Sequence, residues 1–437
     1  MEWWGFLLSF FGLLLFFMFL GMPVVFAFLV VNFLAATYVI GFSAGMNQLV
    51  LSIYDSLAKF TLTPIPLFVV MGELLFYSGL VVKTLDVLAK WLGAIPGRLS
   101  ILSVASGTLF AALSGSSIAN TSMLGSILVP DMRARGYHIK MTVGPLMASG
   151  SLAMIIPPSA VAVLLGSIGQ ISVGDLLIAG IIPGLLMASL FAAYIIIACW
   201  RNPSLAPAYD VEKTSWSERI RSLVVDVLPM GIIILLVVGL IFLGVATPTE
   251  AAAVGALGAL ILVAAYGKLT WSVFKKSMLG TMRISGMILL IIAGSAGFSQ
   301  LLAFTGASRS LVNLVLGLDV APILILIMML LLVIILGMFI EQISIMMITL
   351  PLFMPMVNAL DFDPVWFGIM MLICLDLGNL TPPFGLLLFV MKGVAPKDVT
   401  MIDIYKSAGP FISLETATVF LVMLIPPLAL WLPSLGG

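Results

Sequence analysis

The sequence predicts an all-α polytopic membrane protein whose two halves repeat. The chain has 437 residues, of which 62% are hydrophobic and 9% are charged, whereas a soluble domain carries about 25% charged residues. Long stretches contain no Asp, Glu, Lys or Arg, among them residues 3–54, 141–174 and 284–308. A membrane-spanning helix needs about 20 apolar residues, so each stretch is long enough to hold at least one span.

Other compositional features narrow the class further. The short alternating segments of a β-barrel are absent, and helices are the remaining way to satisfy the backbone in lipid. A formal net charge of zero argues against a nucleic-acid partner. Cys199 and Cys374 lie in apolar runs and are expected to be small buried hydrophobes. The start, with Trp3 and Trp4, lacks the basic region of a signal peptide and predicts a first span with an external N-terminus.

A polar stretch at residues 201–221 divides the chain near its middle and predicts an interfacial linker. We expect one repeat in residues 1–210 and a second in residues 222–437. Landmarks recur in the same order about 225 residues apart: Pro23 with Pro248, Gly79 with Gly306, Pro130 with Pro355, and Pro157 with Pro382. In transporters built from inverted repeats, binding sites lie near the bilayer midplane where helices are interrupted.

The first candidate site segment is rich in hydroxyl and amide side chains. Ser and Asn bond to nearby backbone and open a helix, and opened backbone at membrane depth must be buried or line a wet cavity. Such oxygens suit a monovalent cation, while the N-terminus of a half-helix suits an anion. A small-residue packing face is the alternative. The candidate ligands are Ser114, Ser116, Ser117, Asn120 and Thr121.

Two adjacent prolines interrupt an apolar run in each half, and each pair removes two backbone donors. A simple proline kink is the alternative, but two copies at one offset favour paired ligand segments. The candidates are Pro157, Pro158 and Ser159 in the first half, and Asp376, Gly378, Asn379, Thr381, Pro382 and Pro383 in the second.

Further candidates are Glu341, Gln342 and Ser344, the counterpart of the serine-rich segment. A carboxylate at membrane depth is costly and points to function; a helix end near the interface is the equally weighted alternative.

The remaining acids have more ordinary interpretations. Thr247 and Glu250, on either side of Pro248, predict a capped helix start. Glu73 and Glu415 stay open between packing, ion pairing and an ion relay. The single histidine, His138, is expected in a solvated loop.

Four motifs together resemble the large membrane subunit of tripartite ATP-independent periplasmic (TRAP) transporters: LSGSSIANTSMLGSILVPDMRARGY, IIPPSAVAVLLGS, ATPTEAAAVGALGA and TPPFGLLLFVMKGVAP. The resemblance covers essentially the whole chain. It implies an elevator-type transporter with two inverted structural repeats. Re-entrant hairpins would turn near residues 114–121 and 341–344, and helices would break near residues 155–159 and 376–385.

The same resemblance implies a sodium-coupled secondary importer of small organic anions in the bacterial inner membrane. Dicarboxylates, sialic acid and sulfonates are all open as substrates. No cofactor is expected besides Na⁺ as the coupling ion. The expected partners are a small four-helix membrane subunit, on a separate polypeptide, and a periplasmic substrate-binding protein. We place Na⁺ at Ser116, Ser117, Asn120, Asn379 and Thr381.

Three other functions are alternatives to this prediction. A stand-alone sodium/organic-anion symporter that needs no binding protein is the main alternative, because the same fold serves it. An intramembrane enzyme is disfavoured, since Ser116 has no base near it in the sequence. A passive channel would conduct ions without saturation.

Overall fold

The computed structural model describes residues 3–93, 95–114, 116–207, 215–317 and 319–435, which form helices and connections without a β-strand. Seven helices of this part are long and apolar enough to cross a membrane, and the bent pair α8–α9 makes an eighth. The predicted all-α polytopic class is therefore confirmed. Cys199 and Cys374 are both buried, as expected.

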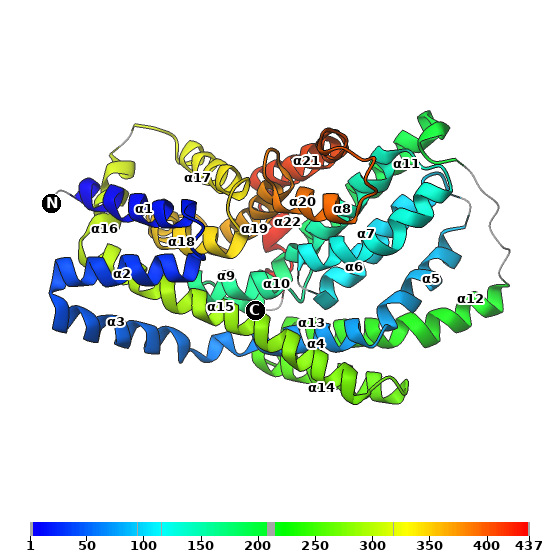
Figure 1. Cartoon of the computed structure of the whole chain (residues 1–437), viewed down its shortest axis with the longest axis horizontal. Coiled ribbons are helices and arrows are strands. Elements are labelled where there is room, and N and C mark those ends of the chain that lie inside the picture. Colours follow the sequence, from blue (N-terminus) through cyan, green and yellow to red (C-terminus); the bar gives the residue numbers. More distant parts are fainter. Residues whose placement is uncertain (1–2, 94, 115, 208–214, 318, 436–437) are drawn as a thin grey trace.

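The helices of the two halves follow one another in the same order (Figure 1). The first half contains α1 Trp3–Phe19, α2 Val24–Ile40, α3 Phe42–Leu57, α4 Pro64–Tyr77, α5 Leu80–Leu92, α6 Arg98–Ser114, α7 Ser117–Ala134, α8 Ile139–Ile155, α9 Ala160–Gly169, α10 Val173–Ala179 and α11 Ile181–Arg201. The second contains α12 Trp216–Ser222, α13 Leu228–Phe242, α14 Pro248–Ala265, α15 Trp271–Phe304, α16 Ala307–Leu316, α17 Pro322–Gly337, α18 Gln342–Ala359, α19 Pro364–Leu380, α20 Leu386–Val394, α21 Met401–Leu424 and α22 Pro427–Leu430. Residues 208–214 of the predicted linker lie outside the described residues.

Glycine and capping residues determine where several helices of the two halves begin. Gly79 precedes α5 with φ of 74° and Gly306 precedes α16 with φ of 72°, a left-handed conformation that glycine adopts without steric cost. Before α14, Thr247 accepts a hydrogen bond from the Glu250 backbone while the Glu250 side chain accepts from the Thr247 backbone. The predicted capped start is confirmed as a capping box.

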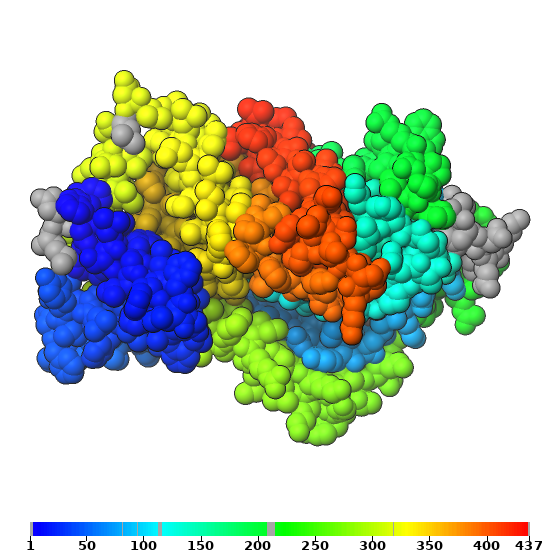
Figure 2. Space-filling model, turned by 45° about the horizontal axis from the view of Figure 1, so that its top comes forward, coloured from blue at the N-terminus to red at the C-terminus, as the bar shows by residue number. Residues whose placement is uncertain are grey.

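Two helical hairpins and two interrupted helices occupy corresponding places in the halves. The hairpins are α6–α7 and α17–α18: α6 ends at Ser114 and α7 begins at Ser117, whereas α17 and α18 are joined by residues 338–341. In the first half, α8 and α9 meet at an angle of 43° around residues 156–159. In the second half the sequence places the break too early: α19 stays helical through Leu380, so the interruption covers residues 381–385 only. Figure 2 shows the segment after this break, in orange, seated between the yellow and cyan hairpins.

We infer the two faces of the molecule from a path in which successive spans alternate in direction. The ends of α9 and α18 and the start of α19 lie together, because residues of all three line one cavity with Lys59. An alternating path would place the start of α1, the end of α21 and Arg309 at this same face, and most of the other lysines and arginines of the described residues at the opposite face. Three ion pairs join separate segments: Lys83–Asp226, Lys90–Glu218 and Arg133–Asp398.

Candidate functional site

The turn of the first hairpin meets the interrupted helix of the other half. Ser117, in the first turn of α7, is fully buried and donates a hydrogen bond of 3.1 Å to Oδ1 of Asp376 in α19. Both predicted segments therefore lie side by side although they are 259 positions apart. The neighbouring Ser116 caps α7 by accepting from the Ala119 backbone, and the side chain of Ser114 lies outside the described residues.

Asn120 and Thr121 follow on the buried side of α7. The Asn120 amide donates to the carbonyl oxygens of Gly107 in α6 and Ser149 in α8, at 3.2 and 3.1 Å. Its Oδ1 is buried without a hydrogen-bond partner, as is Oγ1 of Thr121. A Cβ atom on Gly150 would lie 2.0 Å from this Oγ1, so only glycine lets α8 approach the hydroxyl so closely. Two buried oxygen acceptors are thus left without donors beside the hairpin turn.

Two buried carboxylates add further oxygens to this region. Asp376 and Glu415 are both completely buried, and Ser151 of α8 donates a 2.6 Å hydrogen bond to Oε1 of Glu415. The second oxygen of each carboxylate lacks a partner, and neither acid belongs to any of the four ion pairs of the described structure. A buried, uncompensated carboxylate is costly, so this region favours a bound cation.

The second hairpin makes a smaller polar contact with the same helix. The Asn379 amide donates a 2.6 Å hydrogen bond to Oε1 of Gln342, the first residue of α18, and its Oδ1 is buried without a partner. Glu341 caps α18 by accepting from the backbone N–H of Ser344. Glu341 therefore stands at a helix end, where its half-buried carboxylate stabilises the hairpin turn. Its role as a ligand stays a prediction.

Close glycine contact holds the second hairpin against the interrupted helix. A Cβ atom on Gly378 would lie 2.7 Å from Cα of Gly337 in α17 and 3.0 Å from the carbonyl oxygen of Ile334. Backbone atoms cannot swing away as a side chain does, so Gly378 has a packing role, and its predicted role as a ligand stays a prediction. Its neighbour Asn379 is thereby held against the hairpin.

The two proline breaks are built alike. Pro157–Pro158 and Pro382–Pro383 both contain cis peptide bonds. Ser159 is fully buried and caps α9 by accepting from the Ala162 backbone. At the second break, the Thr381 hydroxyl donates to the Leu377 carbonyl at 2.6 Å. The predicted hydroxyls therefore have structural hydrogen bonds here, and the first proline pair faces apolar side chains of α10 and α13.

Sequence reasoning missed one member of this cluster and left another open. Ser151 was not singled out, although it follows Ser149 and Gly150 inside an apolar helix, which is the available signal. Glu415 was left undecided, and only the packing of α21 against α8 and α19 places it beside Asp376.

The donor set fits a sodium ion. On α7, α19 and α21, five oxygens of the carboxylate, amide or hydroxyl type are buried without hydrogen-bond partners: they belong to Asn120, Thr121, Asp376, Asn379 and Glu415. Three further oxygens of this kind lie elsewhere, on α2, α4 and α15: they belong to Asn32, Glu73 and Ser285. Hard cations prefer such oxygen ligands. Within the described residues no group of three or more His, Cys, Asp or Glu side chains is assembled for a metal ion.

Several known proteins are similar to this chain over most of its length. The family described as "Tripartite ATP-independent periplasmic transporter, DctM component" matches residues 11–428. The C4-dicarboxylate TRAP transporter large permease protein DctM of Pseudomonas aeruginosa is 32% identical over 90% of this chain and 91% of its own length. The sialic acid TRAP transporter large permease protein SiaM of Vibrio cholerae is 30% identical over 96% of both. The ectoine TRAP transporter large permease protein TeaC of Halomonas elongata is 28% identical over 97% of both.

Two solved transporter structures share the fold. The YdaH transporter of Alcanivorax borkumensis has a TM-score of 0.65 at 15% identity and covers 91% of both chains. MtrF of Neisseria gonorrhoeae has a TM-score of 0.65 at 16% identity and covers 90% of this chain and 85% of its own. At this level of identity the similarity concerns the fold alone.

Proposed function

The chain belongs to the family of TRAP transporter large membrane components, and on that premise we propose that it is the transport subunit of a sodium-coupled importer of small organic acids. TRAP large components are inner-membrane transport proteins rather than enzymes, and the chain is placed in that membrane with several spans. Relatives are named for C4-dicarboxylates, sialic acid and ectoine. All three substrates carry a carboxylate, and another relative is named for isethionate, which is a sulfonate. The proposed substrate class is therefore the small organic acid with a carboxylate or sulfonate group.

The observation that carries sodium coupling is the set of buried oxygens without donors around α7, α19 and α21. Na⁺ bound there would compensate Asp376 and Glu415 and supply positive charge near the turn of the first hairpin. The N-terminus of α7 starts at the same turn and adds the positive end of its helix dipole. Together these features would make the region attractive to a carboxylate once Na⁺ is bound.

The proposed movement is an elevator shift of the two hairpins with α8–α9, α19–α20 and α21, the helix that holds Glu415. Two polar contacts support this grouping, because Ser117–Asp376 and Gln342–Asn379 tie each hairpin to α19. The moving group would then carry the oxygen cluster as one body against α1–α4 and α13–α15.

The distribution of basic residues supports an orientation for import. By the positive-inside rule the face rich in Lys and Arg is cytoplasmic. The opposite face, which carries Lys59 and Arg309 and both ends of the described chain, would then be periplasmic. Substrate delivered by a periplasmic binding protein would arrive at this face.

The test is uptake by proteoliposomes that contain this chain with its small membrane subunit and the substrate-loaded binding protein. Radiolabelled succinate, N-acetylneuraminate and ectoine are each offered under an inward Na⁺ gradient and under an equal K⁺ gradient. We expect uptake of at least one acid with Na⁺ and background uptake with K⁺. Equal uptake in both gradients contradicts the coupling. Full uptake without the binding protein instead identifies a stand-alone symporter.

A further inference from the structure

A polar cavity of about 660 Å³ lies away from the oxygen cluster. Helices α3 and α15 line one side of it, and the ends of α9 and α18 line the other. None of the candidate site residues lines it. It opens at the face that we orient towards the periplasm, between helices proposed to stay fixed and helices proposed to move.

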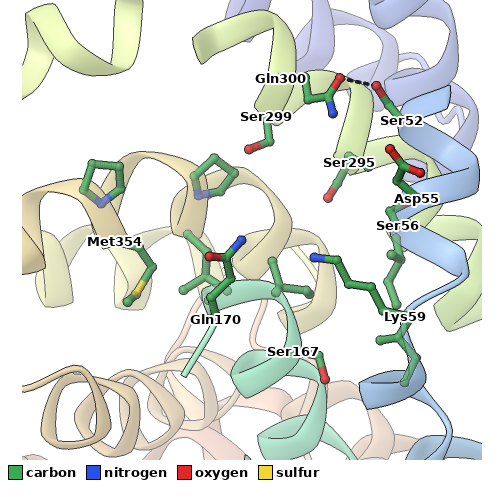
Figure 3. A pocket seen from close by; sticks show the side chains of 18 of the residues that line it. Ser52, Asp55, Ser56, Lys59, Ser167, Gln170, Ser295, Ser299, Gln300 and Met354 are labelled. Carbon is green, nitrogen blue, oxygen red and sulfur yellow. Dashed lines mark hydrogen bonds between the residues drawn. The ribbon is translucent and has the colours of Figure 1, made fainter. Parts of the chain in front are cut away.

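Hydrogen-bonding side chains converge on this space from α3, α9 and α15 (Figure 3). Ser52 and Gln48 both donate to Oε1 of Gln300, which leaves the Gln300 amide nitrogen on the cavity side. Gln170, at the end of α9, points its amide towards the same space. A solvated helix face would explain polar residues on α3 alone, but not polar residues that face it from α9 and α15.

The cavity also holds two charged groups of opposite sign. Lys59, just after α3, extends its ammonium into the space, and Asp55 lies about one helical turn earlier on the same wall (Figure 3). Neither takes part in the ion pairs found in the described residues. Lys59 is the only Lys or Arg among the described residues that line the cavity. The two charges are therefore available to a ligand.

We propose that this cavity is an outer substrate subsite, in which Lys59 binds the carboxylate of a small organic acid and Asp55 binds a cationic or hydrogen-bond-donating group of the same molecule. The assignment rests on the proposed function and narrows its substrate class. A ligand with one carboxylate and donor groups matches both charges. A dicarboxylate would place its second negative charge near Asp55 and is disfavoured.

The volume agrees with such a ligand. Small-molecule sites in proteins typically measure about 300–1,000 Å³, so the cavity accommodates an organic acid of a few to about twenty heavy atoms with bridging water. Because its walls belong to both the fixed and the moving helices, its shape would change during an elevator shift. An acid released by the binding protein would bind here before it reaches the buried cluster.

Binding is tested with the purified full-length chain in complex with its small membrane subunit. Thermal-shift titrations with ectoine, N-acetylneuraminate and succinate give an apparent Kd for each acid. We expect ectoine or N-acetylneuraminate to stabilise the protein more than succinate. Lys59→Gln should weaken this binding about tenfold, as expected for the loss of one charged contact, and Lys59→Arg should keep it. Arg309→Gln, which removes the other basic residue of this face outside the cavity, is the matched control.

Restoring a positive charge at position 59 distinguishes a direct role of Lys59 in binding from an effect of its substitution on the structure. Lys59→Cys introduces an exposed thiol, while Cys199 and Cys374 are buried and protected from reagents. An aminoethyl methanethiosulfonate should restore binding, and a sulfonatoethyl reagent should abolish it. The proposal is overturned if no acid shifts the wild-type melting temperature, if Lys59→Gln binds normally, or if both reagents act alike. Sodium-dependent uptake by the wild-type complex is measured separately, so failure of the subsite does not count against sodium coupling.

Discussion

Replacing Asp376 by Asn removes a buried negative charge while keeping the size of the side chain and one oxygen ligand. The carboxylate is fully buried, accepts one hydrogen bond from Ser117 at 3.1 Å, and has a second oxygen without a partner. At an effective dielectric constant of about 20, a cation about 4 Å away gains roughly 4 kcal/mol from a unit negative charge. Because the Asn oxygen still binds the cation and desolvation of the carboxylate is relieved, we expect about a third of this energy to be lost.

That loss corresponds to roughly a tenfold weaker affinity for Na⁺, at about 1.4 kcal/mol per factor of ten. The assay is initial uptake in proteoliposomes as a function of external Na⁺, from which the half-saturating concentration is read. Asp363→Asn is the control, because Asp363 caps the exposed start of the same helix and Asn caps helices equally well. The reasoning is refuted if the Asp376→Asn complex is folded and half-saturates at the wild-type Na⁺ concentration, or if both variants shift alike.

Three further substitutions probe the packing and polarity of the same region. Gly378→Ala forces the backbones of α17 and α19 apart and should lower the free energy of unfolding by about 1–3 kcal/mol, so that the melting temperature and uptake both fall. Gly286→Ala is the control and should change neither, because no atom lies within 4 Å of its added Cβ. Asn120→Ala removes the side-chain donor to the carbonyl oxygens of Gly107 and Ser149. It should lower the free energy of unfolding by about 1–3 kcal/mol and weaken the activation of uptake by Na⁺. Normal activation by Na⁺ would remove this side chain from the site. Ser151→Ala deprives Glu415 of its hydroxyl donor and should alter the Na⁺ dependence of uptake without preventing assembly, which purification and Na⁺ titration will check.

The membrane class and the approximate positions of the helix interruptions were accessible to sequence reasoning, because they depend on local properties. Charge-free runs have the length of a span, and glycine and proline restrict the backbone wherever they occur. The two hairpin turns and the first proline break therefore lie near the predicted positions. The second break begins later than predicted, since the polar residues Asp376 and Asn379 are paired with other helices and do not open α19.

The ligand roles of the candidate residues stay predictions, but packing gives several of them a structural contact that the sequence did not reveal. Ser116, Ser159 and Glu341 each cap a helix. Conversely, Glu415 looks like one of several isolated acids, and its significance depends on the neighbours that α8 and α19 supply. A side chain's available lone pairs can be counted only when all of its contacts are known.

The sequence by itself determined that this is a helical membrane protein of two repeated halves with polar interruptions, since hydropathy and backbone restriction act over a few residues. Tertiary structure alone decided which interruptions meet. Ser117 contacts Asp376 across 259 positions, and no local pattern encodes that distance. Only packing leaves oxygens of Asn120, Thr121 and Asp376 buried without donors, because hydrogen-bond satisfaction is a property of the assembled neighbours and not of the residue.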